Sequence, residues 1–138
     1  IQYTGIDTNT NLKPAYDKLF KNHKNINMIW KSCLEVDLSE LDFDFVLTSP
    51  PYIDLEVYEN MTKFNSKENF HKNFLIPMIS ACRKYCKGLV AINIAPDMYK
   101  DLTETFDYEK CEMVEDLKEQ KQGKTPDNIY IWSSQRII

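Results

Sequence analysis

The chain has 138 residues, of which 43% are hydrophobic and 28% are charged, as is typical of a single soluble globular domain. No apolar run approaches the roughly 20 residues of a membrane-spanning helix, so we expect no membrane partner and a cytoplasmic location, or the host cytoplasm or nucleus if the source is viral. The net charge of −4 argues against unaided binding of duplex nucleic acid, which usually needs a basic surface.

The first predicted strand, 1–6, ends at an acid and is followed by a helix from about residue 13 to residue 22. An acidic side chain just past a strand in a nucleotide-binding sheet accepts hydrogen bonds from ribose hydroxyls. Asp7 is therefore a candidate ribose-binding residue, and its neighbour Thr8 is a candidate for the same site. The residue type fits an N-cap or an Asx turn equally well, and the sequence alone leaves both interpretations open.

A short strand over 27–30 comes next, followed by Lys31-Ser32-Cys33. We expect Trp30 to pack in the core. The cysteines lack the paired short spacings of a zinc site, so we predict reduced thiols and no metal. Two of them stand four residues apart on one predicted helix, but a helical metal half-site there lacks a nearby histidine. The four cysteines are Cys33, Cys82, Cys86 and Cys111.

The strand predicted over 43–48 runs directly into Thr48-Ser49-Pro50-Pro51-Tyr52. Two consecutive prolines fix φ and remove two backbone donors, leaving a stiff corner with free carbonyl acceptors. A hydroxyl precedes this corner and an aromatic ring follows it. Together these groups suit a flat base that bears an exocyclic amine. The alternatives are a proline-rich turn that closes a strand, or a ligand of a proline-binding domain. Such ligands lie in disordered polar segments, whereas this one follows an apolar strand.

The second half continues the alternation of helix and strand. Its run Leu89–Ile94 is almost entirely apolar, as expected of a strand covered on both faces. The alternation predicts a doubly wound α/β domain over residues 1–138 that closes with an antiparallel hairpin. The expected elements are helix 68–86, strand 89–94, helix 98–106, strand 111–118 and strand 128–132.

The tetrad Ser49-Pro50-Pro51-Tyr52, placed after an apolar strand, resembles that of S-adenosylmethionine-dependent amino-methyltransferases. These enzymes methylate N4 of cytosine or N6 of adenine in DNA, and the serine form is most typical of the cytosine enzymes. The resemblance implies a Rossmann-like, mostly parallel sheet, S-adenosylmethionine as cofactor and a flipped DNA base as substrate. It also implies that Ser49 and Pro50 accept hydrogen bonds from the amine, that Pro51 stiffens the corner and that Tyr52 stacks on the base.

The resemblance also implies a cofactor site. Asp7 and Thr8 end the family's second strand, where an acid holds the ribose. Ser32 and Cys33 stand where family members often carry an aspartate that contacts the adenine amine, so the chain departs from the pattern there. Thr48 adjoins the tetrad and is the last of the candidate cofactor-binding residues. On the rim of the sheet, Asn93 and Pro96 are secondary candidates for lining the base pocket, whereas His71 is expected on the surface.

One expected part is missing. The family's glycine-rich loop follows its first strand, yet the chain contains only Gly5, Gly88 and Gly123, all far apart. In the family order 3-2-1-4-5-7-6, the absent first strand is central, and its loss would split the sheet and expose two edges. The chain is then a fragment of a longer enzyme, or a second subunit supplies the strand, or strand 43–48 pairs directly with strand 1–6.

The resemblance leaves two further alternatives open. The chemistry can be retained with another target, namely adenine N6 or an RNA base. The chain can instead be a degenerate methyltransferase-like module that binds or regulates, which the missing loop and Ser32 favour and the intact tetrad opposes. We expect the isolated chain to bind S-adenosylmethionine weakly or not at all.

Overall fold

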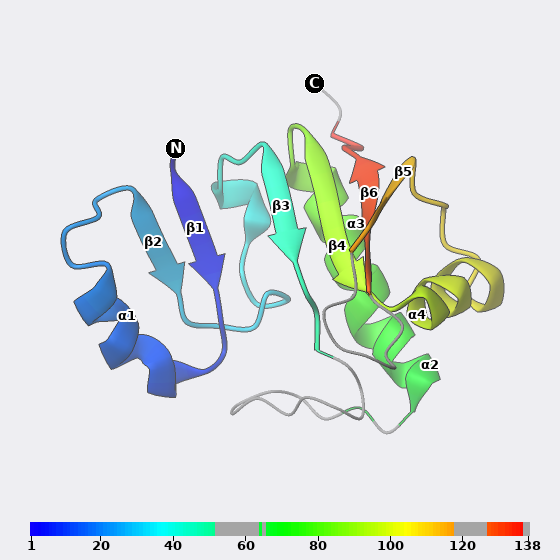
Figure 1. The fold of residues 1–138 in the computed structure, drawn as a ribbon, viewed down its shortest axis with the longest axis horizontal. Helices are drawn as coiled ribbons and strands as arrows, with labels where there is room; N and C mark the ends of the chain where they lie inside the picture. Colours follow the sequence, from blue (N-terminus) through cyan, green and yellow to red (C-terminus); the bar gives the residue numbers. More distant parts are fainter. Residues whose placement is uncertain (52–63, 65, 118–126, 137–138) are drawn as a thin grey trace.

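The computed structural model describes residues 1–51, 64, 66–117 and 127–136. It is an α/β protein with parallel and antiparallel strands (Figure 1). Every strand and helix expected from the sequence has a counterpart, with ends that differ by a few residues. The elements are β1 Tyr3–Ile6, α1 Lys13–Leu19, β2 Ile26–Ile29, β3 Phe45–Thr48, α2 Lys67–Phe70, α3 Ile76–Tyr85, β4 Leu89–Ile94, α4 Pro96–Lys100, β5 Met113–Asp116 and β6 Asn128–Ser133.

The strands form two sheets. β1 and β2 make a parallel pair, and the second sheet has the order β3-β4-β6-β5. In it, β3 and β4 are parallel, whereas β6 runs antiparallel to both β4 and β5. β1 and β3 are not hydrogen-bonded to each other, although Figure 1 shows their arrows pointing the same way. Direct pairing of strand 43–48 with strand 1–6 is therefore wrong, and the described strands form two separate sheets.

The split also changes the balance of strand directions. The sequence predicted a mostly parallel sheet, but two of the four strand pairs among the described residues are antiparallel. The C-terminal antiparallel hairpin is confirmed by β5 and β6.

The hydrophobic core covers one face of the larger sheet. Val90 and Ile92 of β4 lie opposite Trp132 and Tyr130 of β6, and all four side chains are buried. The Trp132 Nε1 donates to the carbonyl of Glu109 at 2.8 Å, which satisfies its only polar atom. The helical segments close the core from one side with Phe70, Leu75, Ile79, Cys82 and Leu102.

The opposite face of the larger sheet is open at β3. Phe45 and Leu47 are 54% and 62% exposed, and Leu89 beside them on β4 is 41% exposed. The expectation that residues 89–94 are covered on both faces is therefore wrong at Leu89. Periodicity along the chain identifies an apolar strand but does not reveal which elements lie against each face.

The helix expected over 68–86 is interrupted by a π-helical turn, His71–Leu75, between α2 and α3. Pro77 explains the interruption, because it lacks the N–H that would bond the carbonyl four residues earlier. The amide of Ile76 donates instead to the carbonyl of His71, five residues back. The second expected helix starts at Pro96, two residues earlier than predicted, because proline suits the first turn of a helix.

His71 was expected on the surface, and this is wrong. Its side chain is only 2% exposed and stacks on Phe106, with ring centroids 4.6 Å apart. It stands four residues before Leu75, so both side chains lie on the face of the helix that packs into the core. Its Nδ1 has no hydrogen-bond partner among the described residues. Burial, opposed by the charge of Asp101, lowers the pKa of His71 below its ordinary value of 6.5.

This burial predicts a pH dependence of folding. His71 protonates more readily in the unfolded chain than in the folded one. The stability that the neutral, buried His71 side chain gives to the fold is therefore fully present above about pH 6.5, and it is lost as the pH falls through the lower pKa of the folded state. Urea unfolding of wild type and His71→Phe between pH 7.5 and 5 should show a smaller loss of stability in the variant. The exposed His23 supplies the control, since His23→Gln should retain the wild-type dependence. Parallel curves for wild type and His71→Phe would contradict the prediction.

Gly88 is required by a close backbone approach. A Cβ atom at this position would overlap the carbonyl oxygen of Asp44, which accepts from the amide of Leu89 at 3.3 Å. Gly88→Ala should therefore lower the free energy of unfolding by about 3 kcal/mol, because the start of the β3–β4 pair must shift. Gly5→Ala is the matched control. Its Cβ meets the flexible end of Met28, so a loss of about 1 kcal/mol or less is expected. Equal losses in urea melts would refute this reasoning.

Candidate functional site

The Ser-Pro-Pro corner begins where β3 ends. The parallel register pairs Thr48 with Ile92, so the next residue of each strand, Ser49 and Asn93, meet at the carboxyl edge of the sheet. The Nδ2 of Asn93 donates to the Ser49 Oγ at 3.0 Å. This bond ties the corner to a strand whose buried side chains belong to the core.

Burial within the corner is uneven. Ser49 is exposed, Pro50 is buried and Pro51 is half-buried. The first proline therefore anchors the corner, while the serine hydroxyl remains open to a ligand. Thr48, the last residue of β3, is half-buried. Tyr52, the predicted stacking residue, lies outside the described residues.

Asp7 and Thr8 follow β1 at the carboxyl edge of the smaller sheet. The Asp7 amide donates to the carbonyl of Ile29 at 3.1 Å, which continues the ladder with β2. The Asp7 Oδ1 accepts from the amide of Asn9 at 2.8 Å. This is an Asx turn, one of the two interpretations that the sequence left open. It engages one carboxylate oxygen of a half-buried side chain.

Ser32 and Cys33 follow the end of β2. The Ser32 Oγ accepts from the amide of Leu34 at 3.3 Å, so its hydroxyl hydrogen is not used in that bond. Cys33 is half-buried against the core, and burial raises the pKa of its thiol. Because β1 and β2 are parallel, these residues share one edge of the smaller sheet with Asp7.

The predicted site residues thus form two groups on different sheets. One group, Asp7 with Thr8 and Ser32 with Cys33, ends the smaller sheet, and the other, Thr48 to Pro51, ends β3 of the larger sheet. In Figure 1 the arrows of β1, β2 and β3 point the same way, so both groups end strands of one common direction. The break between the sheets separates the candidate cofactor residues from the Ser-Pro-Pro corner.

The bond between Asn93 and Ser49 was not predicted, although Asn93 and Pro96 were candidates for the rim. A signal for it existed in the sequence, because Asn93 is the only polar residue of Leu89–Ile94. Pro96 is the first residue of α4, so its place is explained by the start of that helix. The sequence did not show that position 93 lies beside position 49, because strand register is set by the fold.

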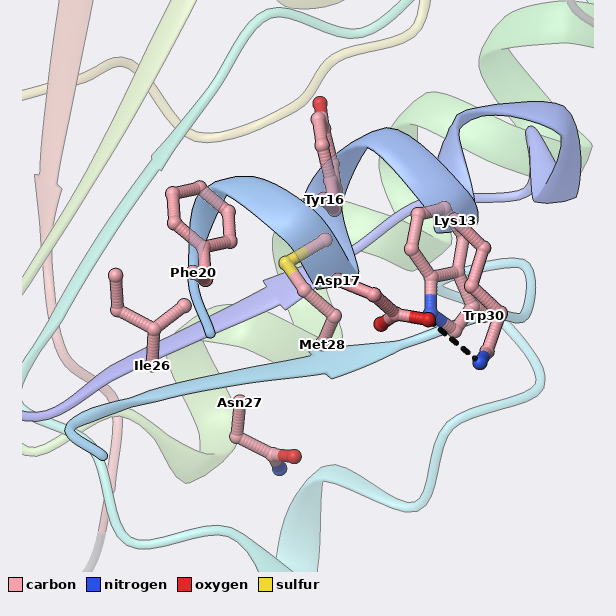
Figure 2. A pocket seen from close by; sticks show the side chains of 8 residues that line it. All are labelled: Lys13, Tyr16, Asp17, Phe20, Ile26, Asn27, Met28 and Trp30. Atoms are coloured by element: carbon pink, nitrogen blue, oxygen red, sulfur yellow. Dashed lines mark hydrogen bonds and ion pairs between the residues drawn. The ribbon is translucent and has the colours of Figure 1, made fainter. Parts of the chain in front are cut away.

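A separate hollow of about 330 Å³ lies between α1 and β2 (Figure 2). Figure 2 shows an ion pair at its edge, where Lys13 Nζ lies 3.2 Å from Asp17 Oδ2. Trp30, expected in the core, is half-buried here and packs on Tyr16 with ring centroids 5.5 Å apart. None of the predicted site residues lines this hollow. It is lined by Lys13, Tyr16, Asp17, Phe20, Ile26, Asn27, Met28 and Trp30.

The chemistry of the remaining candidate groups is limited. All four cysteines are free thiols, and burial together with the neighbouring thiols raises the pKa of Cys82 to about 12. Among the described residues, no cluster of histidine, cysteine or carboxylate side chains suits a metal ion.

No helix in the described ranges has the length and apolar character to cross a bilayer. No known protein-family model matches the chain.

Proposed function

We propose that the chain is the catalytic part of an S-adenosylmethionine-dependent amino-methyltransferase that acts on an exocyclic amine of DNA, namely N4 of cytosine. The observation that carries the proposal is the Ser-Pro-Pro corner. It stands at the carboxyl end of a parallel strand, where α/β sheets bind their ligands. Ser49 is exposed and is held by Asn93, while Pro50 is buried beneath it. An exposed hydroxyl anchored by Asn93 and followed by the Pro50 carbonyl suits an NH₂ group.

The order of the strands supports the proposal. Figure 1 shows β1 on the side of the smaller sheet that faces β3, so the order of strands across both sheets is β2-β1 followed by β3-β4-β6-β5. The family order 3-2-1-4-5-7-6 predicts this arrangement when its first strand is left out. We infer that a strand from outside residues 1–138 fills the break and completes a Rossmann-like sheet. With such a strand in place, the two groups of site residues would lie along the same edge of one continuous sheet, where its parallel strands end.

The fit of the chain to S-adenosylmethionine differs between the two halves of the cofactor. Asp7 and Ser32 offer oxygens at the ends of adjacent strands, which suits the ribose and the adenine amine. The chain contains no glycine-rich loop to bring backbone amides to the methionine half. The inferred strand would have to be followed by that loop. When bound, the cofactor supplies a methyl group already activated by its sulfonium.

The protein's contribution to the reaction is alignment. The target base leaves the DNA stack and its amine enters the corner. Ser49 Oγ and the Pro50 carbonyl accept the two amine hydrogens, and these bonds direct the nitrogen lone pair toward the methyl carbon. The bound cofactor would supply the methyl group, exchanging its S–C bond for the new N–C bond, and the displaced amine proton would pass to water. Tyr52 would stack on the base, which stabilises binding by roughly 1–3 kcal/mol.

The direct test is mass spectrometry of nucleosides from DNA treated with the complete protein and cofactor carrying a deuterated methyl group. The expected product is labelled N4-methylcytosine. Labelled N6-methyladenine, or a product found only with RNA, would correct the target while keeping the chemistry. Absence of any labelled nucleoside would overturn the proposal in favour of a methyltransferase-like binding module, which the missing loop would then explain.

A further inference from the structure

Asn93 is an unusual residue for its place. It interrupts an apolar strand whose neighbouring residues, Ile92 and Ile94, are fully buried. Its Oδ1 is buried without a hydrogen-bond partner among the described residues. A buried carbonyl without a partner costs folding free energy, and a half-buried β-branched residue would suit the strand better. The stability of the sheet therefore does not explain an asparagine at this position.

The amide nitrogen of the same side chain makes a specific contact. It donates to the Ser49 Oγ at 3.0 Å. A serine hydroxyl has two lone pairs and one hydrogen, so this bond uses one lone pair and leaves the other lone pair and the hydrogen available. An unrestrained serine side chain samples three staggered rotamers. The bond from Asn93 holds one of them.

We infer that Asn93 is a positioning residue, which fixes the Ser49 hydroxyl so that its remaining lone pair faces the amine of the target base. This inference rests on the proposed function. Asn93 acts through Ser49, since its oxygen is buried and one of its two amide hydrogens is donated to the Ser49 Oγ. Its support is rigid, because β4 lies between β3 and β6 in the larger sheet.

The test compares variants of the complete protein in steady-state methylation of a DNA substrate. Asn93→Ala should lower kcat by about threefold to tenfold, as expected for loss of one hydrogen bond and of one held rotamer. KM for DNA should stay within about twofold of the wild-type value, because the substitution removes no contact that binds the DNA equally in the ground state and the transition state. Asn27→Ala is the matched control, since Asn27 is an exposed strand asparagine of β2. It should retain wild-type kcat.

Two further readouts separate positioning from a structural role. In a Ser49→Ala background, Asn93→Ala should cause no additional loss of kcat, because it acts through the missing hydroxyl. Asn93→Asp should be impaired at neutral pH, where the carboxylate has no hydrogen to donate. Its activity relative to wild type should then rise as the pH falls and the neutral acid forms. A purely structural defect would not produce this change in the pH profile.

The outcomes distinguish the two claims. An inactive wild-type protein would remove the proposed function and this inference with it. An active wild type with unchanged kcat in Asn93→Ala would overturn the inference alone. The same holds if Asn93→Ala lowers kcat equally with and without the Ser49 hydroxyl, or if Asn93→Asp shows the pH profile of the wild type.

Discussion

Residues 1–138 alone should bind S-adenosylmethionine with a Kd weaker than about 1 mM, and a fusion that restores the central strand should bind it near 10 μM. The fusion places a short apolar strand, a Phe-x-Gly-x-Gly loop and a helical crossover ahead of Ile1. The physical reason is the break between β1 and β3. Asp7 and the Ser-Pro-Pro corner now end different sheets, and no glycine-rich backbone is present to hold the methionine half of the cofactor.

Isothermal titration calorimetry measures this difference directly. Hydrogen exchange supplies a readout that does not need the cofactor, because a strand that fills the break should slow amide exchange in β1 and β3. A fusion with a proline in the middle of the added strand is the control, since proline cannot donate to a sheet ladder. It should leave both binding and exchange unchanged. Micromolar binding by residues 1–138 alone would refute the prediction, as would a fusion that binds no better.

If the proposed function holds, Ser49→Ala should lower kcat of the complete protein about a hundredfold, in line with the loss of one group that stabilises a transition state directly. Ser49 is exposed, and among the described residues its hydroxyl is hydrogen-bonded only by Asn93, so the substitution should leave the melting temperature nearly unchanged. The larger effect expected here than for Asn93→Ala follows from the proposed mechanism, in which Ser49 contacts the reacting amine and Asn93 acts only through Ser49.

Ser39→Ala is the matched control for this experiment. Ser39 is an exposed serine bonded to Asp37 in the short 3₁₀ turn Leu38–Glu40, and its removal should not alter kcat. Single-turnover rates with labelled cofactor separate methyl transfer from product release. If Ser49→Ala transferred methyl groups at the wild-type rate, the corner would not hold the amine, and the proposed mechanism would fail.

Much of the fold was predictable because strands and helices depend on local patterns. The apolar run 89–94, the prolines at 50 and 51 and the glycine at 88 marked their elements within a few residues. The break in the sheet was also predictable, although only through the resemblance to a family whose central strand has no counterpart in this chain. The π-helical turn at His71 was missed, because Pro77 had been read as part of an unbroken helix.

The candidate site was predictable only as separate pieces. The tetrad and Asp7 stand out through residue type and through their places at strand ends. The contact between Asn93 and Ser49 was not evident, because it joins residues 44 positions apart and depends on the register between two strands. The burial of His71 depends similarly on Phe106, which directly follows the π-helical turn Asp101–Thr105, far along the chain from His71.

The sequence by itself determined the order of the elements, the stiff corner after β3 and the absence of a glycine-rich loop, since these follow from residue types and short-range geometry. Only the tertiary structure decided which strands pair, that Asn93 holds Ser49, and that Phe45 and Leu47 remain exposed beside an unpaired edge. The reason is physical: hydrogen-bond partners and burial are set by chain segments far apart in sequence, and local propensities do not specify them.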